Sequence, residues 1–523
     1  MLHRLALGCL VLLCVVASAF AQETDPDRLE AVKEFQRFFK KFKTESEQRE
    51  AVLTLRGQEC VPAVDELLKL TSNKSAVVQR TAFEVLASYS KASSFQPWID
   101  GLADNKDATE KAMLIRIFGS AKLAGAKDAI SVAAADPKAS SQIRYESVRA
   151  LTAFGDKGSG KILQPLLADA DPLVRMAVAD AIGKLEIDDL GAAIVPLLKD
   201  AEWQVQAAAV SACAAVRPQA AVQPLIDLLR QKGRLQTECA EALFKITGFE
   251  FGLDADRWQE QWTKLMEIEG WRIPTREELA KKAESRKKYN EIYGQKEAGL
   301  PSFAGIPTTS TNVLFIIDVS GSMDDLVVER EKFQGYADSR KFTVVRAQLL
   351  SALDSLTENT NFNIVKFASD LTPWKPKLVP ANIVNREAAK AWAKQLKPIG
   401  GTEDQNLAAA GLGGLADLDG GKTNTLKAVL YPFGVDPENP PKAAITGGDK
   451  VSIKNKLDTV YFLSDGRPSV GKIIDTREIT KEVARYNEAF RIVFHTIAIG
   501  EFQKEFLRDL AVQNGGVFID LGR

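Results

Sequence analysis

Five side chains with oxygen donors stand in three short segments of the second half of the chain. They are Asp318, Ser320, Ser322, Thr402 and Asp465. Two carboxylates and three hydroxyls form a donor set of low charge, which suits a hard divalent ion such as Mg²⁺ in near-octahedral geometry. We therefore predict a metal site at these residues.

Apolar runs of strand length predict the elements that must position these side chains. Strands are expected at 313–317, 362–367, 459–463 and 492–499, with helices near 344–356, 386–396 and 480–490. Continuous apolar strands separated by helices indicate a mainly parallel sheet with both faces covered. In such sheets ligands bind at the carboxyl ends of the strands. Asp318 and Asp465 follow predicted strands at that end, so the three segments are expected to meet there.

The segment from residue 312 to the C-terminus resembles a von Willebrand factor A domain with a metal-ion-dependent adhesion site. The family's Asp-x-Ser-x-Ser, Thr and Asp elements match the five residues above. The resemblance implies an α/β doubly wound, Rossmann-like fold, in which the serines and sometimes the threonine touch the metal while the aspartates act directly or through water. It implies Mg²⁺ (or Mn²⁺ or Ca²⁺) as cofactor, and a protein partner whose acidic side chain completes the coordination. The alternative is that the loops fold this way and bind no metal.

Two features depart from the family pattern. Glu403 and Asp404 follow Thr402, where an acidic side chain could bind the ion and block a partner's carboxylate, although we expect both to face solvent. The segment from about 418 to 456 is far longer than the loop this fold needs before its fourth strand. A loop of that size is usually functional or disordered, and its position predicts that it flanks the metal face.

The first half of the chain shows helical periodicity and internal repeats. Residues 174–182 and 205–213 share one pattern of small and large apolar residues, and further copies give a period near 31 residues. A second helix in each unit is expected to carry a proline near its first turn, where the missing N–H costs nothing. Each unit is then a helical hairpin that resembles a HEAT-type repeat, with armadillo-like or other hairpins as the alternative. Stacked hairpins form an all-α solenoid. The prolines are Pro62, Pro97, Pro165, Pro196 and Pro224.

Residues 1–21 have a basic start, an apolar run and an Ala-Phe-Ala cleavage site, which predicts a secretory signal peptide, with an uncleaved anchor as the alternative. A solvated helix of mixed charge is expected between the two domains. Trp258 and Trp262 share one helical face, where we expect them to cap the last repeat. The predicted parts are a signal peptide at 1–21, a HEAT-like solenoid at 22–268, a charged helical linker at 269–310, and the von Willebrand factor A domain at 311–523 with its insertion at about 418–456.

Composition excludes several classes of function. Lys plus Arg total 68 and Asp plus Glu total 69, so the 523-residue chain lacks the basic surplus typical of nucleic-acid-binding proteins. It has two histidines, His3 and His495, and His3 is expected to leave with the signal peptide. One histidine makes a His-based zinc site or a Ser-His-Asp hydrolase hard to build. Cys60, Cys213 and Cys239 are expected to be buried thiols, with a Cys213–Cys239 bridge as the alternative.

These features predict an exported, non-enzymatic protein of binding or adhesion type, located in the periplasm, cell envelope or extracellular space. A divalent metal would engage a partner's carboxylate, and the solenoid would offer a second protein-binding surface. Repeats of this kind joined to an A domain resemble exported bacterial proteins. The alternative is a non-catalytic subunit or scaffold of a chelatase-type ATPase complex, although the signal peptide argues against it because such motors need cytoplasmic ATP. We expect no nucleic-acid partner and no membrane span after signal cleavage.

Overall fold

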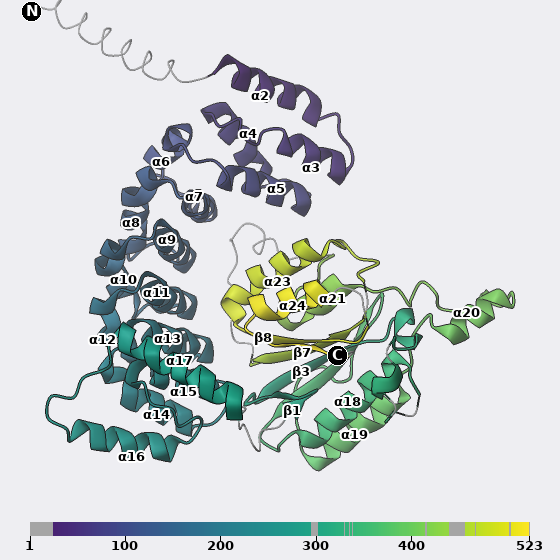
Figure 1. The fold of residues 1–523 in the computed structure, drawn as a ribbon. Helices are drawn as coiled ribbons and strands as arrows, with labels where there is room; N and C mark the ends of the chain where they lie inside the picture. The colour runs from purple at the N-terminus through teal and green to yellow at the C-terminus, as the bar shows by residue number, and fades with distance from the viewer. Residues whose placement is uncertain are drawn as a thin grey trace, which may run out of the picture. The chain divides into compact units, whose positions relative to one another are not determined.

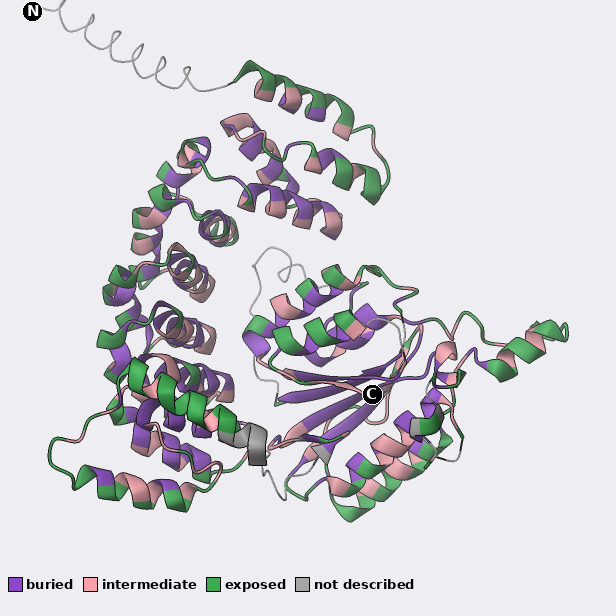
Figure 2. Cartoon of the chain, viewed as in Figure 1, coloured by how far each residue is buried: buried purple, intermediate pink, exposed green. Residues whose placement is uncertain are grey.

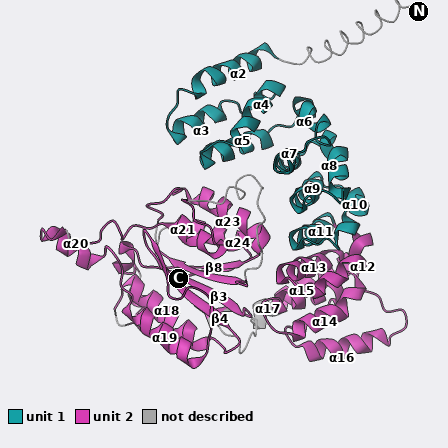
Figure 3. Ribbon diagram, turned by 180° about the vertical axis from the view of Figure 1, so that it is seen from behind, with its two compact units in different colours: residues 1–185, 442–450 teal, residues 186–441, 451–523 magenta. Residues whose placement is uncertain are grey.

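The computed structural model describes residues 25–293, 302–328, 330–333, 335–336, 338–413, 416–438, 456–465, 467–500 and 504–521. The predicted signal peptide and nearly all of the second half of the insertion, 439–455, lie outside the described residues. The chain divides into two compact units (Figure 3), residues 1–185 with 442–450 and residues 186–441 with 451–523. The predicted division into four parts stays a prediction, because the second unit contains both helical hairpins and the sheet.

The described part of the first unit is helical throughout. Side chains cap several helices: Ser75, Asp107 and Ser140 accept hydrogen bonds from N–H groups of the first turn. A Cβ on Gly119 would lie 2.6 Å from the Cα of Ala150, so small residues let these two helices approach closely and bury their apolar faces (Figure 2). The α-helices are α2 (Pro26–Phe39), α3 (Glu45–Leu53), α4 (Val61–Leu70), α5 (Ala76–Ala87), α6 (Gln96–Asp100), α7 (Ala108–Ser120), α8 (Lys127–Ala135), α9 (Ser141–Phe154), α10 (Gly160–Leu166) and α11 (Pro172–Leu185).

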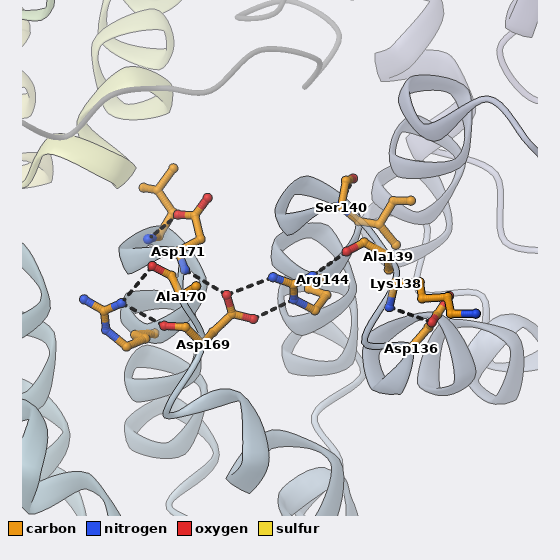
Figure 4. Close-up of polar contacts among 11 residues, drawn as sticks. Asp136, Lys138, Ala139, Ser140, Arg144, Asp169, Ala170 and Asp171 are labelled. Atoms are coloured by element: carbon orange, nitrogen blue, oxygen red, sulfur yellow. Dashed lines mark hydrogen bonds and ion pairs between the residues drawn. The ribbon is translucent and has the colours of Figure 1, made fainter.

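Three repeats carry a polar side chain at the equivalent position of a helix, and each of these side chains donates a hydrogen bond to the loop that precedes its helix. Arg144, Arg175 and Gln206 are spaced by 31 residues, and each donates to a backbone carbonyl five or six residues upstream. Arg144 also donates to both carboxylate oxygens of Asp169 in the next loop, at 2.5 and 2.9 Å (Figure 4). The Arg144 and Asp169 side chains are only 15% and 4% exposed. This buried ion pair therefore joins two consecutive repeats.

The proline prediction is wrong at one repeat. Pro165 is the sixth residue of the seven-residue α10 instead of lying in its first turn. A 3₁₀ turn at 157–159 begins this segment early, so the proline falls near the end of the helix. The helix ends one residue later, as expected when a proline interrupts helical hydrogen bonding.

The second unit begins with further helical hairpins. The Gln223 and Gln259 amides exchange hydrogen bonds of 2.7 and 3.0 Å between α14 and α16. Trp258 is buried, whereas Trp262 is half-buried and packs edge-on against Trp271 at 5.5 Å. The predicted cap is thus centred on one indole. The α-helices here are α12 (Gly191–Ile194), α13 (Trp203–Val216), α14 (Val222–Arg230), α15 (Gln236–Thr247), α16 (Ala255–Met266) and α17 (Arg276–Tyr293).

Helix α17 is the charged helix predicted between the domains. Most of its described side chains are exposed, as predicted. The prediction is wrong for Arg286, which pairs with Glu241 at 2.6 Å and Glu250 at 2.7 Å and lies over the ring of Phe244 at 4.5 Å. Charge periodicity indicates that a helix has a solvent-exposed face, but it does not indicate which acidic residues from elsewhere in the fold contact that helix.

Among the described residues, seven strands form one sheet in the order β5-β4-β3-β7-β8-β9, with β6 also beside β4. Strands β3, β4, β7, β8 and β9 are parallel, and β5 and β6 are antiparallel to β4. The predicted mainly parallel α/β fold is confirmed. The strands are β3 (Asn312–Asp318), β4 (Asn361–Phe367), β5 (Leu371–Pro373), β6 (Val379–Pro380), β7 (Thr459–Ser464), β8 (Val493–Ala498) and β9 (Phe518–Asp520), preceded by the hairpin β1 (Ser302–Phe303) and β2 (Ile306–Pro307).

Helices cover both faces of this sheet (Figure 1). Helices α18 (Lys341–Ser355) and α19 (Ile383–Gln395) lie on one face, and α21 (Thr425–Leu430), α23 (Thr476–Phe490) and α24 (Lys504–Gln513) lie on the other. Helix α20 (Thr402–Ala409) projects from the domain and buries none of its side chains.

The described first part of the insertion, residues 418–438, packs against the rest of the A domain. Its α21 contributes buried side chains, and the ring of Phe433 stacks on those of Tyr486 and Phe494, with centroids 5.9 and 5.8 Å apart. The carbonyl of Gly421 accepts the N–H of Gly321 at 3.0 Å. This part of the insertion therefore completes the core and touches the predicted metal loop.

Candidate metal site

Asp318 is the last residue of β3, and its carboxylate organises the loop that follows. Its Oδ1 accepts the N–H of Ser320 at 2.8 Å, and its Oδ2 accepts the hydroxyl of Ser464, the last residue of β7, at 2.5 Å. Strands β3 and β7 are parallel neighbours, so their carboxyl ends lie side by side. The sheet thereby brings the Asp-x-Ser-x-Ser loop next to Asp465.

Two hydroxyls and the second aspartate complete this cluster. Ser320 Oγ and Ser322 Oγ lie 3.3 Å apart, and Ser322 Oγ donates to Asp465 Oδ1 at 2.9 Å. Asp318, Ser320 and Asp465 are buried, whereas Ser322 is half-buried. Four of the five candidate residues therefore form one hydrogen-bonded set that is partly open to solvent.

Glycine is required at position 321 because another loop crosses it closely. A Cβ on Gly321 would lie 2.6 Å from the carbonyl oxygen of Gly400, a distance at which the backbone would have to move. The sharp turn between Ser320 and Ser322 is one reason for a glycine at this position. The structure gives a second reason, the contact that holds the 400–402 loop against the serine loop.

Thr402, the first residue of α20, joins the site through Asp324. Its backbone N–H donates to Asp324 Oδ2 at 2.8 Å, and Arg340 pairs with Asp324 Oδ1 at 2.7 Å. Arg340 also donates to the Thr402 hydroxyl at 3.4 Å. Burial would raise the pKa of Asp324, but the hydrogen bonds from Thr402 and the charge of Arg340 lower it below its usual value. Thr402 is exposed at the rim of the cluster.

Sequence reasoning missed Asp324, Arg340 and Lys341. The ammonium of Lys341 contacts Asp465 Oδ2 and lies 3.3 Å from the carbonyl oxygen of Ser322. The nearness of Asp324 to the serine loop was a signal that could have been used. Nothing in the sequence indicates that Arg340 and Lys341 belong to the site. An irregular segment separates them from the serine loop, and only the fold brings the start of α18 back to that loop.

Two buried carboxylates close together make a site that favours a cation. Burial, and then the charge of Asp465, raise the pKa of Asp318 above the usual aspartate value. A divalent ion would offset both effects, and the donors around it are all oxygens, so these residues fit a hard ion. No three His, Cys, Asp or Glu side chains group as metal ligands within the described residues. A metal here would therefore depend on the serine hydroxyls.

The acidic residues after Thr402 have different positions. Glu403 has an 82% exposed side chain that lies 3.8 Å from Lys397, so the expectation that it faces solvent is confirmed. The expectation is wrong for Asp404, which is half-buried and accepts the N–H of Gly400 at 2.7 Å. Asp404 thus stabilises the loop that carries Thr402.

Within the described residues, the histidine and the three cysteines are core residues. His495 is buried in β8 and accepts the N–H of Val517 at 3.1 Å, and burial lowers its pKa to about 4. A histidine that is neutral and buried in this way does not act as an acid or base near neutral pH. Cys60, Cys213 and Cys239 are buried and free, which confirms the prediction of core thiols.

Family models match both halves of the chain. HEAT repeats match at 127–193 and 162–244, and a von Willebrand factor type A domain matches at 335–410. The chain contains HEAT repeats and a von Willebrand factor type A domain. The predicted multidomain fold is therefore confirmed, as are the HEAT-type repeats and the A domain, and Thr402 is the one candidate site residue inside the matched segment 335–410.

Similarity to named proteins covers part of the chain. The chain is 28% identical over 214 residues to inter-alpha-trypsin inhibitor heavy chain H4 of Homo sapiens. The aligned segment covers 41% of this chain and 18% of that protein. It is 35% identical over 92 residues to heavy chain H3 of Mus musculus, which covers 18% and 9%. The chain thus spans less than a fifth of the length of these relatives.

Among solved structures, an aerotolerance-related membrane protein from Bacteroides fragilis shares 14% identity, with a TM-score of 0.25 and coverage of 40% of this chain and 91% of that chain. No helix within the described residues combines the length and the apolar character that crossing a membrane requires.

Proposed function

We propose that this chain is a non-catalytic protein-binding protein whose A domain engages a partner through a divalent ion. The observation that carries the proposal is the hydrogen-bonded set of Asp318, Ser320, Ser322 and Asp465 at the carboxyl ends of β3 and β7. Mg²⁺ is the expected ion, with Mn²⁺ or Ca²⁺ as substitutes. When bound, the ion supplies positive charge and a coordination position for an acidic side chain of the partner.

Each candidate residue would have its own role in such a site. Asp318 fixes the serine loop, the two serine hydroxyls face the cluster, and Thr402 stands at the exposed rim where a partner would approach. The HEAT repeats offer a second protein-binding surface, since stacked hairpins form extended faces. The similarity to proteins named as inhibitor heavy chains supports a non-enzymatic role.

The test is isothermal titration of the purified chain with Mg²⁺ and Mn²⁺, accompanied by thermal unfolding with and without EDTA. We expect saturable heat with a dissociation constant of about millimolar or tighter, together with a rise in melting temperature. A chain that shows neither heat nor stabilisation in this range does not use the proposed metal.

Thr402→Ala is expected to reduce carboxylate binding more than metal binding, because Thr402 lies at the rim and the other four residues form the cluster. Glutarate serves as a minimal acidic probe. Saturating glutarate should tighten Mn²⁺ binding by the wild-type chain, since ligands that share a site couple reciprocally. Thr402→Ala should lose most of this gain and keep its Mn²⁺ affinity without glutarate within about twofold. Thr372→Ala, on the edge strand β5, is the control, and equal loss in both variants contradicts the role of Thr402.

We also propose that the chain is exported, with residues 1–21 removed. The basic start, apolar run and Ala-Phe-Ala site of this segment support the proposal. N-terminal sequencing of the protein from envelope and culture fractions should begin at Gln22. Protein that starts at Met1 in those fractions contradicts cleavage, and protein confined to the cytoplasm contradicts export.

A further inference from the structure

Lys341 places a third charge inside the candidate metal site. It is the first residue of α18, and its side chain is only 8% exposed. Its ammonium contacts Asp465 Oδ2 and lies 3.3 Å from the carbonyl oxygen of Ser322. The other acidic side chain paired with it is Asp325, whose Oδ2 is 3.6 Å away and whose side chain is 68% exposed.

The loop after β8 and the start of α18 lie beside this lysine. Gly500 follows β8 with a φ of +132°, and a Cβ there would lie 3.6 Å from Lys341 Cε and 3.7 Å from Asp465 Cβ. The backbone N–H of Lys341 donates to the Asp325 carbonyl at 3.0 Å, which fixes the start of α18 beside the serine loop. The ammonium is therefore held in the site by Asp465 Oδ2 and the carbonyl oxygen of Ser322.

Counting formal charges shows what the lysine changes. Among the buried groups, Asp318 and Asp465 supply two negative charges when ionised, and Lys341 supplies one positive charge. The charges of Arg340 and Asp324 cancel each other, and that of the 68% exposed Asp325 is screened by solvent. With the ammonium present, a bound divalent ion would leave the site with a surplus of one positive charge, whereas without it the charges would cancel. Like charges a few ångströms apart repel even at the moderate effective dielectric of a protein interior. The ammonium should thus oppose the metal and favour an anionic partner group.

We propose that Lys341 is a built-in counter-ion of the metal site, which weakens the binding of a divalent ion and strengthens the preference of the loaded site for a carboxylate. It acts on the metal through Asp465 and is a positioning and charge-setting residue. The proposal rests on the metal-dependent function proposed above. It also accounts for the burial of two adjacent carboxylates, because the ammonium neutralises part of their charge.

The test is Mn²⁺ titration of the full chain at fixed pH and ionic strength. Lys341→Met, with Lys341→Gln as a second neutral variant, should bind Mn²⁺ about tenfold more tightly than wild type. Lys341→Arg keeps the charge and should restore affinity to near the wild-type value. Lys390→Met is the matched control, since Lys390 is a 17% exposed lysine of the same domain that pairs with Asp354 at 2.7 Å and Glu387 at 2.6 Å. This control should bind Mn²⁺ as wild type does.

Two further readouts separate charge from packing. In EDTA the neutral variants should melt below the wild type, and Mn²⁺ should raise their melting temperature by more than it raises that of the wild type. Saturating glutarate should tighten Mn²⁺ binding less in the neutral variants. Unchanged or weaker Mn²⁺ binding in both neutral variants, with normal binding by the wild type, overturns the role of Lys341 alone. Absence of Mn²⁺ binding in the wild type overturns the proposed function, and this inference with it.

Discussion

In the Asp318→Asn variant, Mn²⁺ affinity is expected to fall by at least about a hundredfold while the fold persists. The substitution removes one of the two carboxylates in the cluster and keeps the shape of the side chain. The asparagine amide can still accept the Ser320 N–H, and it can face Ser464 with a donor where the carboxylate accepted. Because burial and Asp465 make the charged form of Asp318 costly, the metal-free variant should be at least as stable as the wild type.

Titration calorimetry and melting curves in EDTA and in Mn²⁺ measure both effects. Asp370→Asn is the matched control: Asp370 belongs to the same domain but pairs with Lys427 at 2.6 Å on an exposed turn. It should leave Mn²⁺ affinity unchanged. Mn²⁺ binding that survives in Asp318→Asn would place the ion elsewhere in the chain, and an unfolded variant in EDTA would mean that the carboxylate is needed for the fold itself.

The four central strands of the A domain, and the helices α18, α19 and α23, could be predicted from the sequence, the strands because they are buried on both faces. Such strands must be apolar along their whole length, as at 313–317 and 459–463, and the pattern is visible without a structure. Strands β5, β6 and β9 escaped prediction because each has two or three residues. Segments that short carry no periodicity, and only the pairing partner defines them.

The part of the candidate site that lies at strand ends could be predicted from the sequence. Asp318 and Asp465 follow neighbouring strands, so their proximity follows from the sheet. The places of Arg340 and Lys341 depend on where α18 begins after an irregular excursion, and the start of a helix is not fixed by an apolar pattern. The same reason explains Asp404: a side chain at the start of a helix finds loop N–H groups that only the folded loop presents.

A large loss of stability is expected when the Arg144–Asp169 ion pair of the first unit is broken. Asp169 accepts two hydrogen bonds from Arg144 and one from the N–H of Asp171 at 2.9 Å. Burial would raise the pKa of Asp169, but these partners outweigh it and hold the pKa below the usual value. The pair's contribution to stability is therefore complete above the ordinary aspartate pKa, and it is lost as the pH falls through the lower pKa of the folded state.

Asp169→Ala leaves the Arg144 guanidinium largely buried without its counter-charge, which should cost about 3 kcal/mol. Because the chain has two compact units, hydrogen exchange of the α9 amides is the suitable measurement, and exchange through opening of this unit should become about a hundredfold faster. Lys127→Met is the control, since it breaks an ion pair with Asp156 in which both side chains are more than a third exposed; it should cost less than about 1 kcal/mol.

The double variant Arg144→Met/Asp169→Leu removes both charges and should recover most of the loss, because an apolar pair can replace a buried ion pair. A double variant as unstable as Asp169→Ala would show that the loop carbonyl contact of Arg144, and not the uncompensated charge, carries the effect.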